Sequence, residues 1–462
     1  MTPFTATQTC IVLTFMRSIQ LFIAAGLVAI LVTVLSCEQP DVADTSTFGL
    51  IQSRILTPSC AIPSCHASGK DATFVQHQLL LSKGKSYDQL VNVASFNDAA
   101  RADGLLRVKP GDPENSLFLH KLHLNASHHG SDYGNPMPLG LDKLTLGQLE
   151  FIETWIKAGA PRTGEVADPA LLDDKTPQPD FFEPLAPPQS GFQMTVGPFS
   201  VPANFEREFY TYRPLGNQEK VYINRFEIKM RDNSHHFILY DFEPGTPALA
   251  IPKDDRLRDI RNQDGTLNIQ VLGAIGYHVF VSGSQTPYMD VKFPDGVAWP
   301  VPAGMKFDLN SHYVNKSSAP FAGEVYINIH TVPAAQVIRE AKALNLGNQG
   351  ISLPPNQRTT LSKTFTTDKT IKVFSLTSHT HKLGESFVIK ISGGPRNGEI
   401  VYQNDDWHHP VNQQYDPPIT LNPGEGLTSV ITWNNTTTRT VSFGLTSEDE
   451  MGIIFGYYYE EP

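Results

Sequence analysis

The chain has 462 residues, a formal net charge of -11, and 40% hydrophobic and 10% aromatic residues. Such a length is typical of about three domains, and the composition is that of a globular protein. Because the chain is acidic and has no local basic patch, we do not expect it to bind nucleic acid. Its 34 glycines and 35 prolines favour turn-rich β structure over an all-α fold.

Residues 1–37 have the features of an export signal. An uncharged apolar run over 19–36 follows Arg17, as in a signal peptide. The run ends in VLSC, which resembles a bacterial lipobox and predicts a lipid anchor at Cys37 in the periplasm or cell envelope. A different cleaved signal or a retained transmembrane helix also fits this run.

The next segments are predicted to be a tether, a helical part and a linker. Residues 38–48 are small and polar, as in a tether. Within the helical part, 49–162, a capping-box pattern at 145–148 precedes an apolar stripe that stops at Gly159. Residues 163–190 are rich in Pro and Asp, which predicts a semi-extended linker between separate domains.

Beyond residue 190 the hydrophobic pattern changes to a period of two. Apolar and charged residues alternate over 225–230, and aliphatic residues take alternate positions over 325–329. Turn residues recur between such runs, for example at 422–424. This pattern predicts two all-β sandwiches, which we place at 191–345 and 346–462.

The helical part contains the strongest local motif. In CAIPSCH, Cys60 and Cys65 immediately precede His66, which is the arrangement that c-type haem attachment requires. The spacing is wider than the usual two residues, and a short disulfide is the alternative. Met137 in NPMP could be the sixth iron ligand, with a histidine as the alternative. CxxxxCH and MPLG…ETWIKAGAP resemble small cytochrome c domains fused to exported bacterial enzymes, which implies an all-α domain with one covalent haem.

Histidines of the β part fall into three groups at predicted strands: His235-His236, His312 and His379-Thr380-His381. Positions i and i+2 of a strand share a face, so His379 and His381 could bind one metal ion. His235 and His236 could do so only if a bulge or strand end turns one of them. Imidazole is suited to copper, zinc and iron alike, whereas a thioether such as that of Met451 selects Cu(I).

The order of these groups resembles that of the copper type II, ascorbate-dependent monooxygenases. The segments DNSHHFILY, LNSHYVN, SHTHKLGESF and SEDEMGIIFGYYY occur in the order expected for that family, and the resemblance covers about 195–460. It implies two jelly-roll sandwiches that each carry one copper ion. The implied ligands are His235, His236 and His312 for an electron-transfer copper, and His379, His381 and Met451 for the copper at which O2 and substrate react.

The resemblance implies an exported oxidoreductase that hydroxylates an activated C–H bond with O2. Its electrons would come from an ascorbate-like reductant, a redox protein or the tethered haem. The family members that act on peptides hold a carboxylate with polar side chains, but Thr377, Ile453 and Phe455 take those positions here. A small apolar or aromatic substrate is therefore expected. The alternatives are a copper-binding or electron-transfer protein without oxygenase activity, and a metal-free adhesion lipoprotein.

Overall fold

The structure is a computed structural model that describes residues 45–63, 65–124, 133–179, 182–262, 266–407, 410–444, 446 and 448–461. The predicted signal peptide, Cys37 and most of the predicted tether lie outside the described residues. Within the described ranges, no helix combines the length and apolar character needed to cross a membrane.

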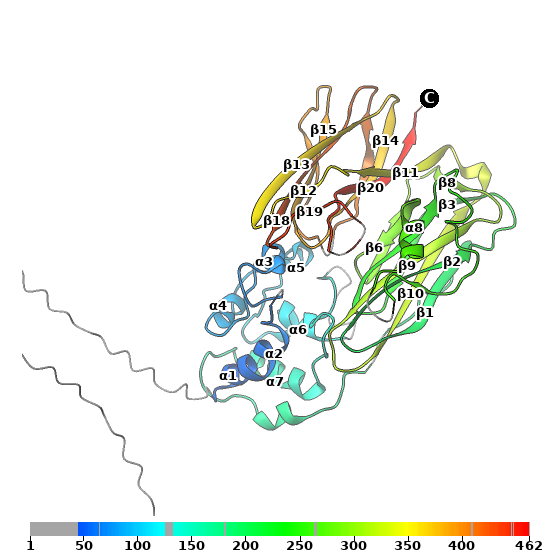
Figure 1. Cartoon of the computed structure of the whole chain (residues 1–462). Helices are drawn as coiled ribbons and strands as arrows, with labels where there is room; N and C mark the ends of the chain where they lie inside the picture. The colour runs from blue at the N-terminus through cyan, green and yellow to red at the C-terminus, as the bar shows by residue number, and fades with distance from the viewer. Residues whose placement is uncertain are drawn as a thin grey trace, which may run out of the picture. The chain divides into compact units, whose positions relative to one another are not determined.

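The first part of the described chain is helical (Figure 1). Its elements are α1 (Thr47–Ile51), η1 (Gln52–Leu56), α2 (Thr57–Ser59), α3 (Ala72–His77), α4 (Ser86–Leu90), α5 (Asp98–Ala102), η2 (Pro113–Asn115), α6 (Leu117–Leu122), α7 (Leu146–Lys157) and η4 (Pro169–Asp173). The predicted capping box is confirmed: the Thr145 hydroxyl accepts from Gln148 N at 3.2 Å, and Gln148 Oε1 accepts from Thr145 N at 3.0 Å. The apolar stripe of α7 forms the centre of the core, where Trp155 is fully buried.

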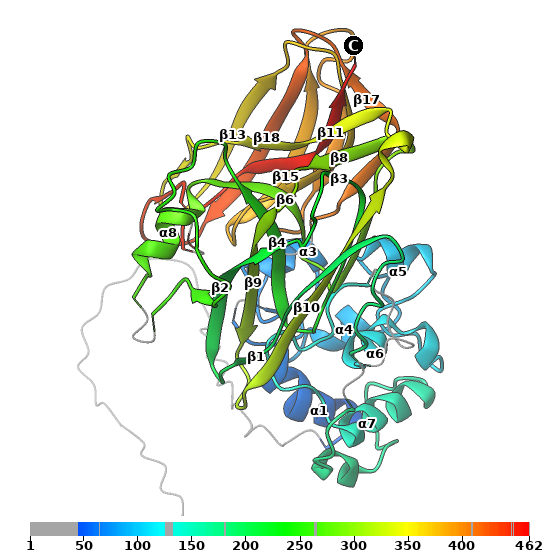
Figure 2. The same ribbon diagram turned by 90° about the vertical axis from the view of Figure 1, so that its right-hand side faces the viewer.

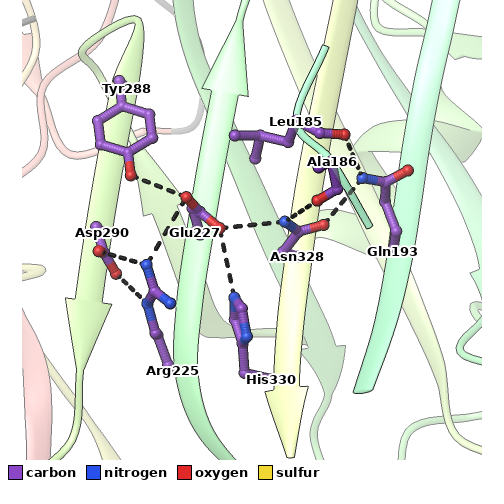
Figure 3. A network of polar contacts seen from close by, with 9 residues as sticks. All are labelled: Leu185, Ala186, Gln193, Arg225, Glu227, Tyr288, Asp290, Asn328 and His330. Atoms are coloured by element: carbon purple, nitrogen blue, oxygen red, sulfur yellow. Dashed lines mark hydrogen bonds and ion pairs between the residues drawn. The ribbon is translucent and has the colours of Figure 1, made fainter. Parts of the chain in front are cut away.

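Parts of the segment predicted as a semi-extended linker pack on neighbouring elements. Asp168 caps η4 by accepting from Ala170 N, so the Pro and Asp residues start a helical turn there. Leu172 of this turn is only 1% exposed and joins the helical core. At the other end, amides of strand residues Gln193 and Asn328 donate to the carbonyls of Leu185 and Ala186 (Figure 3).

The rest of the described chain is mostly β-sheet, as expected from the period-two pattern (Figure 2). A five-stranded sheet has the order β5 (Arg258–Asp259), β2 (Phe205–Pro214), β9 (Lys306–Asn315), β4 (Ser234–Phe242) and β6 (His278–Ser284). A four-stranded sheet has the order β13 (Gln357–Thr366), β18 (Gly426–Asn435), β15 (Gly384–Ser392) and β16 (Ile400–Asn404). Short pieces are the strands β12 (Ser352–Leu353) and β19 (Val441–Ser442), helix α8 (Ile269–Ile275) and η5 (Ala334–Gln336).

A nine-stranded sheet forms the second layer against both of these sheets. Its order is β1 (Gly191–Val201), β10 (Phe321–Val332), β3 (Val221–Met230), β8 (Val297–Val301), β11 (Arg339–Gly347), β20 (Ile453–Glu460), β14 (Ile371–His379) and β17 (Gln413–Leu421), with β7 (Tyr288–Lys292) on β3. The sheet is continuous because β8 and β11 pair in parallel. The layers enclose two β-sandwich cores, one around Phe209 and Phe226 and one around Val373 and Trp433. The predicted boundary between the sandwiches, at 345 and 346, falls within β11.

Both sandwiches have the same hydrogen-bonded turn at the end of one strand. At the end of β9, the Asn315 amide donates to three backbone carbonyls, and its Oδ1 accepts from the Ser317 hydroxyl at 2.6 Å. At the end of β18, the Asn435 amide also donates to three carbonyls, and its Oδ1 accepts from Thr437 Oγ1 at 2.7 Å. The two sandwiches thus share a local structural repeat that the sequence alone does not reveal.

Candidate metal centres

The first three predicted ligands come together on the five-stranded sheet. His236 of β4 lies directly opposite His312 of β9, so the two side chains share a face. A register shift between Ser234 and His236 marks an irregularity at the head of β4. This shift turns His235 to the same side as His236. The two adjacent histidines can therefore bind the same ion.

The ring nitrogens of this group suit a metal ion. One ligand atom from each of His235, His236 and His312 lies within 4.8 Å of the others. The Nδ1 atoms of His235 and His236 are 3.1 Å apart. Nδ1 of His312 is buried and has no hydrogen-bond partner among the described residues. A buried nitrogen without a hydrogen-bond partner destabilises the folded protein unless another group binds it. The Nδ1 atoms of the three histidines therefore fit a copper ion, which binds imidazole well.

Two carboxylates that sequence analysis missed face the same group. Glu206 accepts from His312 Nε2 at 2.8 Å, and Glu208 Oε1 lies 3.7 Å from His236 Nε2. Burial opposes ionisation of Glu208, but His312 and His236 lower the pKa of its carboxyl to about 2. Burial likewise opposes protonation of His312, yet Glu208 and Glu206 raise its pKa. The group therefore lies in a negative environment.

The second predicted group lies at the end of β14. This strand ends at His379, so His381 follows the strand instead of belonging to it, and the two ring centroids are 5.2 Å apart. Nδ1 of His381 is 2.9 Å from the Asp449 carbonyl, which leaves Nε2 available as a ligand. Burial holds the pKa of His379 well below its usual range, and a neighbouring His381 acts in the same direction. Neutral imidazole is the form that binds metals.

Glu450 joins the two loops that carry His381 and Met451. Its buried carboxyl accepts from His381 N at 3.0 Å, from Leu383 N at 2.8 Å and from Trp433 Nε1 at 3.0 Å. The C-terminal loop with Met451 is thereby fixed beside the end of β14. Met451 itself is partly buried and lines the same cavity as the two histidines.

One cavity of about 1970 Å³ connects the predicted sites. The two histidine groups, Met451 and the predicted haem ligands Cys60, Cys65, His66 and Met137 all line it. Both cysteines are free thiols, so the short disulfide considered above is not formed. Nδ1 of His66 lies 3.2 Å from the Leu79 carbonyl, which leaves Nε2 as the atom that could bind iron. The residues present thus fit a haem group as well as copper.

Two half-buried lysines hold the loop that carries Met137. Lys121 Nζ donates to the Tyr133 carbonyl at 2.6 Å and to the Asn135 carbonyl. Lys143 Nζ donates to carbonyls on both sides of Met137, at Pro136 and Pro138. Burial lowers the pKa of Lys121 to about 7 and that of Lys143 to about 8.

Two other histidines of the β part have structural contacts. His278 Nε2 lies 3.0 Å from Asp308 Oδ2, and the His278 ring stacks on Tyr240. His330 contacts Glu227 at 3.4 Å, within the polar network drawn in Figure 3. Neither residue belongs to the three-histidine group.

Comparison with known protein families supports the copper assignment for the C-terminal part. Residues 339–462 match the family model for the copper type II ascorbate-dependent monooxygenase, C-terminal domain. The match supports that family, which is copper-dependent and uses ascorbate as reductant. His379, His381 and Met451 all lie within the matched segment. A monooxygenase of this family implies O2, an organic substrate and a reductant.

Other comparisons add no argument. No curated protein sequence matches the chain. Among solved structures, the chain is similar to the major capsid protein P2 of bacteriophage PM2, with 10% identity, a TM-score of 0.25, and coverage of 59% of this chain and 98% of that chain. It is also similar to the STIV MCP, with 10% identity, a TM-score of 0.25, and coverage of 58% and 96%.

Proposed function

We propose that the protein is a copper-dependent monooxygenase that uses O2 to hydroxylate a C–H bond of a small organic substrate. The observation that carries the proposal is that two different ligand sets line one cavity: His235, His236 and His312 on one sandwich, and His379, His381 and Met451 on the other. The match to the monooxygenase family model over 339–462 supports it. Each set would hold one copper ion.

The two ligand sets suit different tasks. An all-imidazole set accommodates both oxidation states of copper, which suits electron transfer. A set with the soft thioether of Met451 favours Cu(I), the state that must meet O2. When bound, copper supplies one-electron redox chemistry and activation of O2. The chain favours neutral imidazoles here, because burial lowers the pKa of both His379 and His381.

We further propose that one c-type haem delivers electrons to the cavity. Cys60 and Cys65 would attach it, and His66 and Met137 would bind its iron. Support comes from the free thiols, from the orientation of His66 by the Leu79 carbonyl, and from the fact that all four residues line the cavity of the copper sites.

A hydrogen-bonded bridge joins the Met137 loop to the first histidine group. Lys143 Nζ donates to Pro138 O at 2.8 Å and to Asn233 Oδ1 at 3.0 Å. The same Oδ1 accepts from Gly140 N at 3.0 Å. Asn233 is only two residues from His235, so the bridge would offer a short path for electrons between a haem held at the Met137 loop and a copper ion held at the first histidine group.

The wall beside His379 favours an apolar or aromatic substrate. Phe455 lies 6.2 Å from the His379 ring and stacks on Phe280 at 4.2 Å. Ile238 completes this buried cluster, and all three side chains line the cavity. Uncharged apolar groups of this kind bind apolar ligands and cannot pair a carboxylate.

We also propose that the protein is exported and anchored by lipid at Cys37, which rests on the apolar run and lipobox-like end of residues 1–37. Mass spectrometry of the mature N-terminus tests this. A diacylated Cys37 is the expected result, whereas an intact residue 1 would contradict it.

A copper-binding or electron-transfer protein without oxygenase activity is the second candidate. The observation in its favour is that Thr377, Ile453 and Phe455 offer no group that could hold a charged substrate. Both candidates bind copper, so copper content alone does not separate them.

The deciding experiment measures the copper and haem content of the protein and then its O2 consumption with candidate substrates. Elemental analysis and a reduced pyridine haemochrome spectrum are expected to give two copper ions and one covalent haem per chain. O2 uptake is then measured with a panel of small aromatic and aliphatic compounds, together with mass analysis of the products. Hydroxylated product in proportion to O2 supports the monooxygenase. Copper without coupled product supports the second candidate, and a protein without copper contradicts both.

A further inference from the structure

Two carboxylates of β2 share a sheet face with the three-histidine group. β2 pairs with β9, and Glu208 lies directly opposite His312. His312 lies in turn opposite His236 of β4, so the three residues form one row across three strands. Glu206 is two positions before Glu208 and points to the same face.

These side chains determine which ring nitrogens remain for a metal ion. Nε2 of His312 donates to Glu206, and Nε2 of His236 lies 2.7 Å from Asn310 Oδ1. Glu208 in turn accepts from the Asn310 amide at 3.1 Å. With the protons held on Nε2, the lone pairs of both rings are on Nδ1. Nδ1 of His236 lies close to Nδ1 of His235. Nδ1 of His312 has no hydrogen-bond partner among the described residues.

We propose that Glu206 and Glu208 are positioning residues that impose copper binding through Nδ1 and lower the reduction potential of the first copper. The inference rests on the proposed function, because it requires copper at the three-histidine group. A carboxylate that accepts from a ligating imidazole makes that ligand more basic. Two negative charges beside the ion also stabilise Cu(II) relative to Cu(I).

In the second group, no carboxylate of the described residues accepts from a ring nitrogen, although buried Glu450 accepts from the backbone N of His381 and Glu208 also acts electrostatically on both rings. Nδ1 of His381 lies against a neutral carbonyl, that of Asp449, at 2.9 Å. Met451 as a soft ligand favours Cu(I) there. A copper ion held at the first group would therefore have a lower potential than one held at the second group. Glu206 and Glu208 would thereby favour electron transfer from the first group toward the second.

Potentials of single-site variants test the inference. In a His381→Ala background, which is expected to keep copper only at the first group, the midpoint potential is followed by the EPR signal of Cu(II). Glu206→Gln and Glu208→Gln are each expected to raise it by at least about 59 mV, which is a tenfold change in the ratio of Cu(I) to Cu(II). Asp259→Asn is the matched control, because its carboxylate pairs with Arg207 at 2.8 Å on the other face of the same sheet.

Glu206→Asp keeps the charge at a shorter reach, so it is expected to retain the low potential while copper affinity falls. If the glutamine variants bind copper with a potential unchanged from that of the control, the inference is wrong and the proposed function stands. If the His381→Ala background binds no copper, the proposed function itself fails before any potential is compared. If a glutamine variant does not fold, Glu206→Asp still tests the inference. A copper potential in Glu206→Asp that is as high as the one expected for Glu206→Gln would also overturn the inference.

Discussion

The Nδ1 atoms of His235 and His236 lie 3.1 Å apart, although the two residues are neighbours in the chain. In a regular strand their side chains would point to opposite faces. The irregularity between Ser234 and His236 removes that constraint and brings both rings to His312. The first candidate copper site thus depends on a local defect in the pairing of β4 with β9.

Loss of His312 is expected to remove one copper ion and leave the other. In His312→Ala, elemental analysis should give one copper per chain instead of two, because His235 and His236 alone make a weak site. His330→Ala is the control, since that histidine contacts Glu227 outside the group. Two bound copper ions in His312→Ala would contradict the assignment.

Replacing Met451 is expected to separate copper binding from O2 chemistry. Met451→Ile keeps two imidazoles but loses the soft ligand, so Cu(I) affinity should fall about tenfold or more and O2 consumption about a hundredfold. Competition with a chromophoric Cu(I) chelator and an oxygen electrode measure the two effects. Met289→Ile, a methionine of β7 on the same cavity, should leave both unchanged. Equal effects in the two variants would argue against Met451 as a ligand.

The bridge between the Met137 loop and the first histidine group can be cut at Asn233. Asn233→Gly removes the shared Oδ1 but tolerates the positive φ of 67° at this residue. Stopped-flow reoxidation of the haem by copper should slow about tenfold, while the haem spectrum stays the same. Asn356→Gly, with a φ of 52° in the second sandwich, is the matched control. An unchanged rate in Asn233→Gly would exclude the bridge as the electron path.

Glu450 is expected to stabilise the second sandwich strongly. Glu450→Ala leaves three N–H groups without their acceptor, two of them in buried hydrogen bonds, which should lower the free energy of unfolding by about 2–4 kcal/mol. Urea denaturation of the metal-free protein measures this. Glu448→Ala removes an exposed carboxylate paired with Lys382 and should cost less than about 1 kcal/mol. A similar cost for both variants would refute the role given to Glu450.

Acid should destabilise the metal-free protein partly through Glu208. Its pKa is about 2 in the folded protein against an ordinary 4.5, so its ionised form is bound more favourably in the folded state. That contribution is complete above pH 4.5 and is lost as the pH falls toward 2. The free energy of unfolding should therefore fall more steeply over this range in the wild type than in Glu208→Gln. Parallel pH profiles would show that Glu208 is not paired in the folded protein.

Much of the fold followed from local patterns. Helix α7 begins and ends where the capping box and Gly159 predicted, because caps depend on residues only a few positions apart. Strands also cover 225–230 and 325–329, where the alternating pattern predicted them, although Asn328 is buried together with its aliphatic neighbours. The turn at Pro169–Asp173 within the predicted linker was missed, because the burial of Leu172 depends on the helical core against which it packs.

The sequence by itself determined which residues could bind metal and in what order they occur, since imidazole, thiol and thioether chemistry belongs to the residue type. Tertiary structure alone decided that Glu206 and Glu208 face His312 and His236, and that Glu450 joins the loops of His381 and Met451. Those contacts depend on the register between strands far apart in the chain. Register is set by the packing of whole sheets, so no local pattern around a glutamate could indicate it.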